Sequence, residues 1–303
     1  MARNPWRIYK LLKPLDIRVL KAIEKGHRSF GYVPLEYIEK RMKAPPRRVL
    51  ESLDKLNELK LIVRRIGYTT GYKLTYTGLD VIALSNLVAR GVIAALGERI
   101  GVGKEGNIYL AEDPAGNLIV VKFHREGFRS FQGIRRKRLY ASELPRKSWL
   151  RMAKLVGERE FKIMVALREA GARVPEPIAW NRHAVVQEYV PGFELYRIRG
   201  LDVEEAQKLL GDVMDSVRIA YEKVGIVHGD LSEYNILVTE SLEAFIIDWP
   251  QYVYREQEGA EELLERDIGY VVSFFNRRFG LREDPEYWLE YVRGGAESTG
   301  EKP

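Results

Sequence analysis

The chain has 303 residues, 46% of them hydrophobic, which is enough for one large and one small domain with real cores. It has no cysteine, which excludes disulfides and thiolate metal sites, and its net charge of +6 favours anionic partners. The most apolar stretch, residues 81–96, is interrupted by Asn86 and Arg90, and the first 14 residues lack the apolar core of a signal peptide. We therefore expect a cytoplasmic protein without membrane contact.

The first 90 residues have the pattern of a winged helix. Apolar residues recur at helical spacing over 16–24, 34–42 and 45–59. Two β-rich segments, 61–63 and 72–76, follow with glycines between them, and a connector helix is predicted from Gly78 to about Arg90. Cations on and after the third helix and in the wing could contact a nucleic-acid backbone. They are Arg47, Arg48, Lys55, Lys60, Arg64, Arg65 and Lys73. A protein-docking role for the same domain stays open.

A glycine-rich loop opens the next part of the chain. Gly101-Val102-Gly103-Lys104-Glu105-Gly106 satisfies G-x-G-x-x-G, which taken alone also fits an ordinary glycine turn. The sequence continues from Asn107 as a strand, whereas a dinucleotide fold would begin a helix there, and no Gly-Lys-Ser/Thr follows. This context favours a loop that covers phosphates in a strand-rich lobe.

Lys122 and Glu160 are candidates for the residues that position phosphates. Lys122 ends an apolar strand about twenty residues after the loop, where its ammonium can reach phosphate oxygens. A long helix is predicted from about residue 148 to 170, and Glu160 shares its apolar face with Met164 and Leu167, whereas Glu158 faces solvent. We expect an ion pair between Lys122 and Glu160.

The segment His228-Gly229-Asp230-Leu231-Ser232-Glu233-Tyr234-Asn235 carries the strongest chemical signal. It supplies a carboxylate and an amide five residues apart, and Asp248 follows at the end of an apolar strand. The segments 235–238 and 244–248 read as a β-hairpin. Phosphoryl transfer needs one group to orient the nucleophile and oxygen ligands for magnesium. Asp230, Asn235 and Asp248 together provide that set.

These motifs resemble those of protein kinases, with informative departures. Gly229 and Ser232 stand where the common signature has Arg and Lys, and Asp248-Trp249-Pro250 replaces Asp-Phe-Gly. Only about 55 residues follow Asp248, and they contain no Ala-Pro-Glu. With the N-terminal winged helix, the chain resembles the RIO-type atypical protein kinases of the winged-helix, Rio2-like branch.

The resemblance implies an α+β fold. A winged helix with connector helix (1–90) would precede a truncated bilobal kinase domain, with an N-lobe (91–188), a C-lobe (189–293) and a disordered tail (294–303). It also implies ATP and Mg²⁺ as cofactors, with Mn²⁺ an option. Asp230 would be the catalytic base, Asn235 and Asp248 the metal ligands, and the backbone from Glu188 to Val190 the adenine-binding hinge.

Family members take part in maturation of the small ribosomal subunit and autophosphorylate on serine. They can also act as ATPases with a phosphoaspartate at the metal-binding aspartate, which would be Asp248 here. The interval 125–154 holds ten basic and two acidic residues, and we expect a mobile loop there that suits rRNA phosphates, with Ser130 and Ser142 as candidate phosphorylation sites. Asp267 is expected either to brace the catalytic loop or simply to start a helix.

Two alternatives remain. Aminoglycoside and choline kinases also use His-Gly-Asp, although they need a substantial helical substrate-binding subdomain for which the short remainder after Asp248 leaves little room. The other is a scaffold that binds ribosomal precursors and uses ATP as a conformational switch with little turnover.

Overall fold

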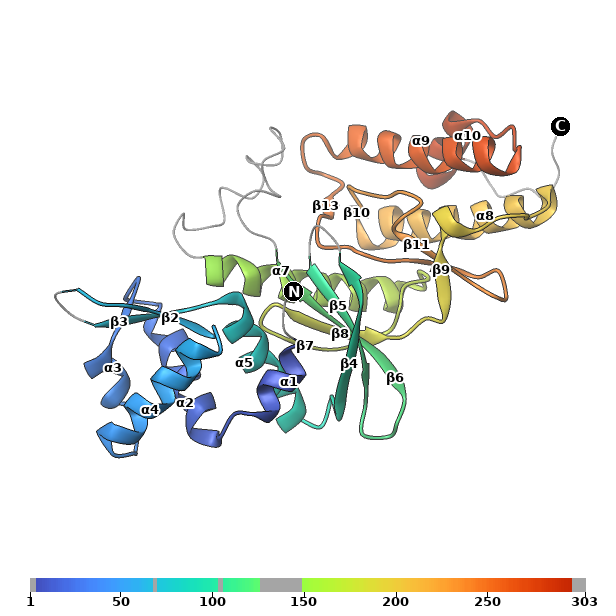
Figure 1. The fold of residues 1–303 in the computed structure, drawn as a ribbon. Helices are drawn as coiled ribbons and strands as arrows, with labels where there is room; N and C mark the ends of the chain where they lie inside the picture. Colours follow the sequence, from blue (N-terminus) through green and yellow to red (C-terminus); the bar gives the residue numbers. More distant parts are fainter. Residues whose placement is uncertain (1–3, 68–69, 103–105, 126–148, 296–303) are drawn as a thin grey trace. The chain divides into compact units, whose positions relative to one another are not determined.

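The computed structural model describes residues 4–67, 70–102, 106–125 and 149–295 (Figure 1). The chain divides into two compact units. The N-terminal unit takes in residues 1–127, 153–157 and 179–186, and the C-terminal unit takes in the rest. No helix in the described ranges is both long and apolar enough to cross a bilayer. The domain boundaries at residues 90, 188 and 293 stay predictions, and most of the expected tail, 296–303, lies outside the described residues.

The N-terminal unit begins with short helices and a small antiparallel sheet. Their bounds are α1 Pro5–Lys10, α2 Pro14–Gly26, β1 Val33–Pro34, α3 Leu35–Glu39, α4 Pro46–Glu58, β2 Ile62–Arg65, β3 Gly71–Leu74 and α5 Tyr76–Ala89. The strands pair in the order β1-β3-β2, and fully buried Leu20, Ile38 and Leu53 come from the apolar faces of α2, α3 and α4. The predicted winged helix is confirmed.

Helix α1 is not predicted by the apolar pattern of the first residues. It forms because Asn4 caps it, accepting the Trp6 N–H at 2.9 Å, and Pro5 occupies the first helical position, where a missing N–H costs nothing. Trp6 and Tyr9 of α1 then pack against the core of the larger sheet in this unit. The helix is therefore stabilised by a cap and by burial.

The larger sheet has five strands in the order β4-β5-β6-β8-β7. Their bounds are β4 Ala95–Val102, β5 Gly106–Glu112, β6 Leu118–His124, β7 Pro177–Asn181 and β8 Ala184–Glu188. Residues 78–85 of α5 are all buried, and Ala83, Leu84 and Leu87 share one apolar cluster with Val121 and Phe123 of β6. The connector helix is thus part of the core beneath this sheet.

The C-terminal unit is mainly helical. Its elements, together with α7, which contributes to both units, are α7 Trp149–Ala170, β9 Gly192–Glu194, η2 Leu195–Arg197, α8 Val203–Ile219, η3 Ala220–Val224, β10 Ile226–Val227, β11 Ile236–Thr239, β12 Ala244–Ile246, β13 Val253–Tyr254, α9 Ala260–Phe279 and α10 Pro285–Val292. Two small sheets, β12-β11-β9 and β10-β13, pack with α8 and α9 around one apolar core that includes Val213, Ile246 and Phe275. The predicted β-hairpin is confirmed by the pairing of Ile236 with Ile246.

Candidate active site

The loop from His228 to Asn235 connects β10 to β11 in the C-terminal unit. The chain enters β10 from η3, a π-helical turn that ends at Gly225 in the left-handed region with φ 76°. Gly229 also has a positive φ, 78°, a conformation that residues with a side chain rarely adopt. Asp230, directly after it, is exposed, whereas His228 and Leu231 on either side are buried. The backbone therefore presents the Asp230 carboxylate to solvent between two anchored residues.

His228 links the two halves of the site. Its Nδ1 accepts the backbone N–H of Asp230 at 3.2 Å, and its Nε2 lies 3.1 Å from the carbonyl oxygen of Ile247. These partners select the neutral tautomer with the proton on Nε2, which donates to Ile247. The ring packs on Trp249 with 4.5 Å between centroids. Hence the histidine fixes Asp230 to the strand end that carries Asp248.

Asp267 and Arg266 of α9 hold the same loop from a second side. The Asp267 carboxylate, 1% exposed, accepts the Gly229 N–H at 2.7 Å. Arg266 donates to the Gly229 carbonyl oxygen at 2.7 Å and also pairs with Asp267 at 2.7 Å. The expected brace by Asp267 is present, and Arg266, which the sequence does not single out, completes it.

Asn235 is oriented by its backbone and its side chain. The backbone N–H donates to the Ser232 carbonyl oxygen at 2.9 Å, and the backbone carbonyl oxygen accepts the Ile247 N–H at 2.9 Å. The side-chain Nδ2 donates to the Asp230 carbonyl oxygen at 2.8 Å. Because the amide nitrogen is used within the loop, the amide oxygen is the atom that could bind a ligand. An oxygen is what Mg²⁺ requires.

Asp248 has a strained backbone. It follows β12 with φ 68°, a left-handed conformation that costs a non-glycine residue roughly 1 kcal/mol or more. The next residue, Trp249, is 1% exposed and donates its indole N–H to the Ile246 carbonyl oxygen at 3.1 Å. The buried indole holds the backbone in this shape. Trp249 therefore helps to position the Asp248 carboxylate by holding its backbone.

The N-terminal unit holds the other predicted site residues. Gly106 begins β5, and a Cβ there would meet the Phe123 carbonyl oxygen at 2.6 Å, so only glycine fits. Lys122 lies on β6 opposite Ile108 and is 6% exposed. Gly101 and Val102 end β4. Gly103, Lys104 and Glu105 lie outside the described residues.

Glu160 and the predicted hinge belong to the C-terminal unit. Glu160 lies on the buried face of α7 and is 1% exposed, and Glu158 pairs with Lys162 on the exposed face, as predicted. The ion pair between Glu160 and Lys122 stays a prediction. Glu188, at the end of β8, donates its backbone N–H to the backbone carbonyl oxygen of Glu176 at 2.8 Å, and Val190 is buried.

The donor set in the C-terminal unit suits magnesium bound together with phosphates. Within the described ranges there is no group of three or more His, Cys, Asp or Glu that could hold a metal by protein ligands alone. Mg²⁺ usually binds through one or two carboxylates with water and substrate phosphates completing its octahedron. One carboxylate, Asp248, and one amide oxygen, Asn235, fit that mode.

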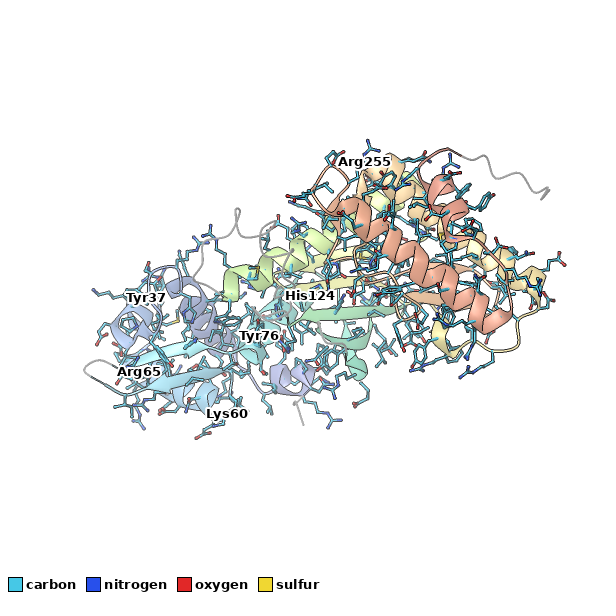
Figure 2. All side chains as sticks on the ribbon, turned by 90° about the horizontal axis from the view of Figure 1, so that it is seen from above. Tyr37, Lys60, Arg65, Tyr76, His124 and Arg255 are labelled. Atoms are coloured by element: carbon cyan, nitrogen blue, oxygen red, sulfur yellow. The ribbon has the colours of Figure 1, made fainter. Side chains whose placement is uncertain are left out.

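The candidate cations of the winged helix differ in their surroundings. Lys55 is already engaged within the domain, because its Nζ lies 2.7 Å from the buried Asp16 carboxylate and 2.7 Å from the Leu11 carbonyl oxygen. Of the others, two have carboxylate neighbours at the surface: Arg47 near Glu51 and Arg64 near Asp54, both at 3.3 Å or less. Arg48, Lys60 and Arg65 are exposed, the last two marked in Figure 2, and Lys73 is half-buried.

Comparison with known proteins accounts for both parts of the chain. Residues 107–287 match the model of the RIO domain, and residues 9–90 match that of the Rio2 N-terminal domain. The RIO-type serine/threonine-protein kinase Rio2 of Methanocaldococcus jannaschii is 39% identical over 268 residues, which cover 88% of this chain and 97% of that protein. For the Dictyostelium discoideum rio2 kinase the identity is 36%, over 88% of this chain and 50% of that protein.

Solved structures give the same result. The Rio2 kinase from Chaetomium thermophilum superimposes with a TM-score of 0.81 at 34% identity, covering 97% of this chain and 89% of that one. Its complex with ADP/Mg²⁺ and phosphoaspartate gives a TM-score of 0.79 at 32% identity, with the same coverage. The predicted fold class and family are confirmed. The chain belongs to the RIO family of atypical serine/threonine-protein kinases, in its Rio2 branch.

Proposed function

We propose that this chain binds ATP with Mg²⁺ or Mn²⁺ and transfers the γ-phosphoryl group with Asp230, Asn235 and Asp248 as its reaction centre. The observation that carries the proposal is the shared anchoring of these residues: His228 binds the Asp230 backbone and the strand end before Asp248, and Asn235 bonds to both segments. Phosphoryl transfer depends mainly on positioning and charge, so rigid anchoring is what the reaction needs.

Each residue has a defined role in this proposal. Asp230, exposed next to a rigid glycine, accepts the proton of the attacking hydroxyl. Asn235 and Asp248 supply the oxygens that hold the metal, which neutralises charge on the phosphates. In the N-terminal unit, the backbone of residues 101–106 covers the phosphates and Lys122 contacts them, steadied by Glu160. The backbone from Glu188 to Val190 receives the adenine.

A phosphoenzyme at Asp248 is part of the proposal. A Chaetomium thermophilum Rio2 structure contains phosphoaspartate with ADP/Mg²⁺. In the corresponding step here, a carboxylate oxygen of Asp248 would attack the γ-phosphorus, the bond to the β-phosphate oxygen would break, and ADP would leave. Water would then cleave the acyl phosphate to inorganic phosphate and restore the carboxylate. Carboxylates are known phosphoryl acceptors.

Single-turnover labelling with [γ-³²P]ATP tests these roles. We expect Asp230→Asn to lower serine autophosphorylation by about 10²- to 10⁴-fold, the usual contribution of a positioned acid–base group. A hydroxylamine-sensitive label on the wild type that Asp248→Asn lacks would support an ATPase cycle. Wild-type autophosphorylation by Asp230→Asn would refute the assigned base. Ser130 and Ser142, the proposed acceptor sites, lie outside the described residues, and mass spectrometry of the product identifies them.

We further propose that the protein acts in the cytoplasm on precursors of the small ribosomal subunit. The exposed cations Arg48, Lys60 and Arg65 of the winged helix support contact with rRNA phosphates. Purification of the tagged protein with and without ATP should recover small-subunit precursors in an ATP-dependent way. Binding to rRNA that stays constant from about 50 to 200 mM salt would argue against electrostatic contact.

A function as a small-molecule kinase is disfavoured, because the relative that matches 88% of this chain is a serine/threonine-protein kinase. An ATP-switched scaffold stays open. It would show normal nucleotide binding and precursor recovery but no turnover.

A further inference from the structure

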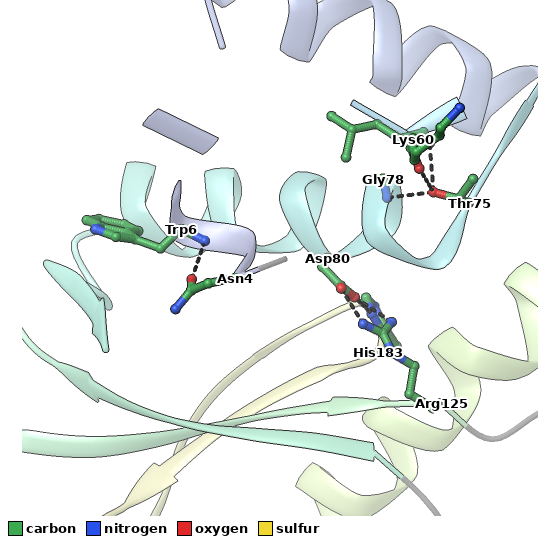
Figure 3. A network of polar contacts seen from close by, with 9 residues as sticks. Asn4, Trp6, Lys60, Thr75, Gly78, Asp80, Arg125 and His183 are labelled. Atoms are coloured by element: carbon green, nitrogen blue, oxygen red, sulfur yellow. Dashed lines mark hydrogen bonds and ion pairs between the residues drawn. The ribbon is translucent and has the colours of Figure 1, made fainter. Parts of the chain in front are cut away.

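Asp80 of the connector helix α5 lies at the centre of a buried polar cluster in the N-terminal unit (Figure 3). Its Oδ1 accepts from Nε2 of His183 at 2.7 Å, and the Arg125 guanidinium donates to both carboxylate oxygens, with Nη1 2.7 Å from Oδ1. Asp80 is 1% exposed and His183 is 0% exposed. A carboxylate is rarely buried to this degree unless it is paired.

The charges in this cluster are balanced. Burial opposes ionisation of Asp80, but Arg125 and the bond from His183 outweigh it and hold the pKa of this carboxyl below its ordinary value. Burial also lowers the pKa of His183, although Asp80 opposes that shift. The neutral imidazole therefore donates Nε2–H, while Arg125 supplies the single positive charge and packs over the Tyr76 ring at 5.3 Å. The result is one ion pair with one neutral hydrogen bond.

A second buried carboxylate repeats the arrangement nearby. Glu24 of α2, 7% exposed, accepts from Arg182 at 2.6 and 2.7 Å and pairs with Lys154 at 2.6 Å. Arg182 and His183 are adjacent in the turn between β7 and β8. The winged-helix segment thus ties down the β7–β8 turn through Glu24 and the end of β6 through Asp80.

The position of the Asp80 contact along β6 gives it a functional meaning. Arg125 directly follows β6, and Lys122 lies three residues before it on the same strand. In the β5–β6 register, His124 is opposite Gly106, where the glycine-rich loop rejoins the sheet, and Lys122 is opposite Ile108. The contact with Asp80 therefore fixes the end of the hairpin that carries both predicted phosphate-binding elements.

We propose that Asp80 is a positioning residue for nucleotide binding: by holding Arg125 and His183, it keeps Lys122 and Gly106, where the glycine-rich segment joins β5, in the geometry that receives phosphates. Asp80 itself does not contact the nucleotide. The inference rests on the proposed function, because it requires that Lys122 and residues 101–106 bind ATP. It makes the winged-helix segment part of the nucleotide site rather than only a docking module.

Asp80→Asn removes the charge and nearly preserves the shape, and Asp16→Asn is its matched control. Asp16 is also a buried carboxylate of the winged helix, 4% exposed, but its side-chain partners are Ser52 at 2.6 Å and Lys55 at 2.7 Å within that domain. We expect Asp80→Asn to raise the Kd for Mg-ADP and the KM for ATP about tenfold, within the roughly 5- to 150-fold range usual for coupled sites. Asp16→Asn should stay within about twofold of wild type, because it leaves β6 untouched.

The rate at saturating ATP separates positioning from general damage. Asp230, Asn235 and Asp248 lie in the other unit, so kcat of Asp80→Asn should fall less than about threefold while KM rises. Hydrogen exchange should show faster exchange of amides in β6 in this variant. An equal loss of Mg-ADP affinity in Asp80→Asn and Asp16→Asn would overturn the proposal. An unchanged affinity in folded Asp80→Asn would overturn it too.

Arg125→Gln provides an independent test if Asp80→Asn folds poorly. It removes the cation, which is 23% exposed, instead of the buried anion. It should weaken Mg-ADP binding to a similar extent, and the double variant should be no weaker than either single one, because both changes remove one link. Additive losses would contradict a shared link. Failure of the wild type to bind Mg-ADP would instead overturn the proposed function itself, and the inference with it.

Discussion

Asp267 offers the most direct test of how the catalytic loop is held. Its buried carboxylate accepts the Gly229 N–H and pairs with Arg266, whose guanidinium also bonds to the Gly229 carbonyl oxygen. Asp267→Ala removes the acceptor of a buried N–H and the counter-charge of Arg266 together. Asp267→Asn keeps an oxygen that can accept from Gly229 but loses the charge. The two variants separate the hydrogen bond from the ion pair.

The expected loss of stability follows from these contacts. A hydrogen bond to a charged group contributes about 1.5–3 kcal/mol, and an unsatisfied buried donor costs a similar amount. The ion pair adds little, because the Arg266 side chain is 34% exposed and regains water when its partner is removed. We therefore expect Asp267→Ala to lower the free energy of unfolding by about 3 kcal/mol and Asp267→Asn by about 1 kcal/mol.

The effect on the reaction should be larger than this loss of stability implies. Gly229 precedes Asp230, and a displacement of about 1 Å at a positioned catalytic group reduces the rate roughly 100-fold. Single-turnover autophosphorylation measures the rate, and urea unfolding followed by circular dichroism measures the stability. Asp215→Ala is the control, because it removes a hydrogen bond from Tyr291 in the same unit away from the loop. A folded Asp267→Ala variant with the wild-type rate would refute the reasoning.

Three further predictions concern the metal, pH and packing. Asn235→Ala should need a much higher Mg²⁺ concentration for half-maximal rate, because it removes one of the two proposed metal ligands; an unchanged metal titration would contradict that role. Asp80 and Glu24 have pKa values below their ordinary 3.8 and 4.5, since pairing outweighs burial in both. Their contribution to the free energy of unfolding is therefore complete above those values and is lost as the pH falls further. The free energy of unfolding measured in urea should then fall below about pH 4, and it should fall less steeply in Asp80→Asn than in wild type. Gly157→Ala, whose Cβ would meet backbone at 2.6 Å, should lower the melting temperature, whereas Gly211→Ala in open space on α8 should stabilise by about 0.5–1 kcal/mol.

Much of the fold could be predicted because periodic burial leaves a trace in the sequence. Helix α7 spans Trp149–Ala170 where a helix from 148 to 170 is predicted, and Glu160 lies on its buried face as its spacing from Met164 indicates. Helix α3 ends at Glu39 instead of reaching residue 42. Arg41, in the turn after it, packs over the Tyr37 ring at 3.5 Å, a contact that spacing alone does not report.

The proposed catalytic residues could be nominated from the sequence for a different reason. Asp230, Asn235 and Asp248 stand on neighbouring segments with fixed spacing, and their chemistry limits which residue types can serve. The residues that hold them are less visible. Arg266 is recognisable only once α9 is seen to place it against Gly229. Asp80 and His183 are 103 positions apart, and a single long-range ion or hydrogen-bond pair leaves no periodic pattern in one sequence.

Lys55 shows the opposite case, in which the sequence pattern nominated a phosphate contact for a lysine that pairs with a carboxylate of its own domain. A lysine on the third helix of a winged helix has the right place for a phosphate contact, but the buried Asp16 needs a counter-charge, and Lys55 supplies it at 2.7 Å. Satisfying a buried carboxylate takes precedence, because an unpaired one would cost several kcal/mol. The nucleic-acid hypothesis therefore depends on Arg48, Lys60 and Arg65.

The buried carboxylates Asp80 and Glu24 also restrict how the winged helix can act. An apolar contact would hold α2 and α5 against the sheet at least as firmly, since buried ion pairs often contribute little net stability. A charged pair differs in being directional, and the observed placement of α5 lets Asp80 bond to Arg125 and His183 together. A partner that shifts α5 must then break these bonds or move β6 together with α5. By linkage, such a partner changes the affinity for nucleotide by the same factor by which nucleotide changes the affinity for the partner.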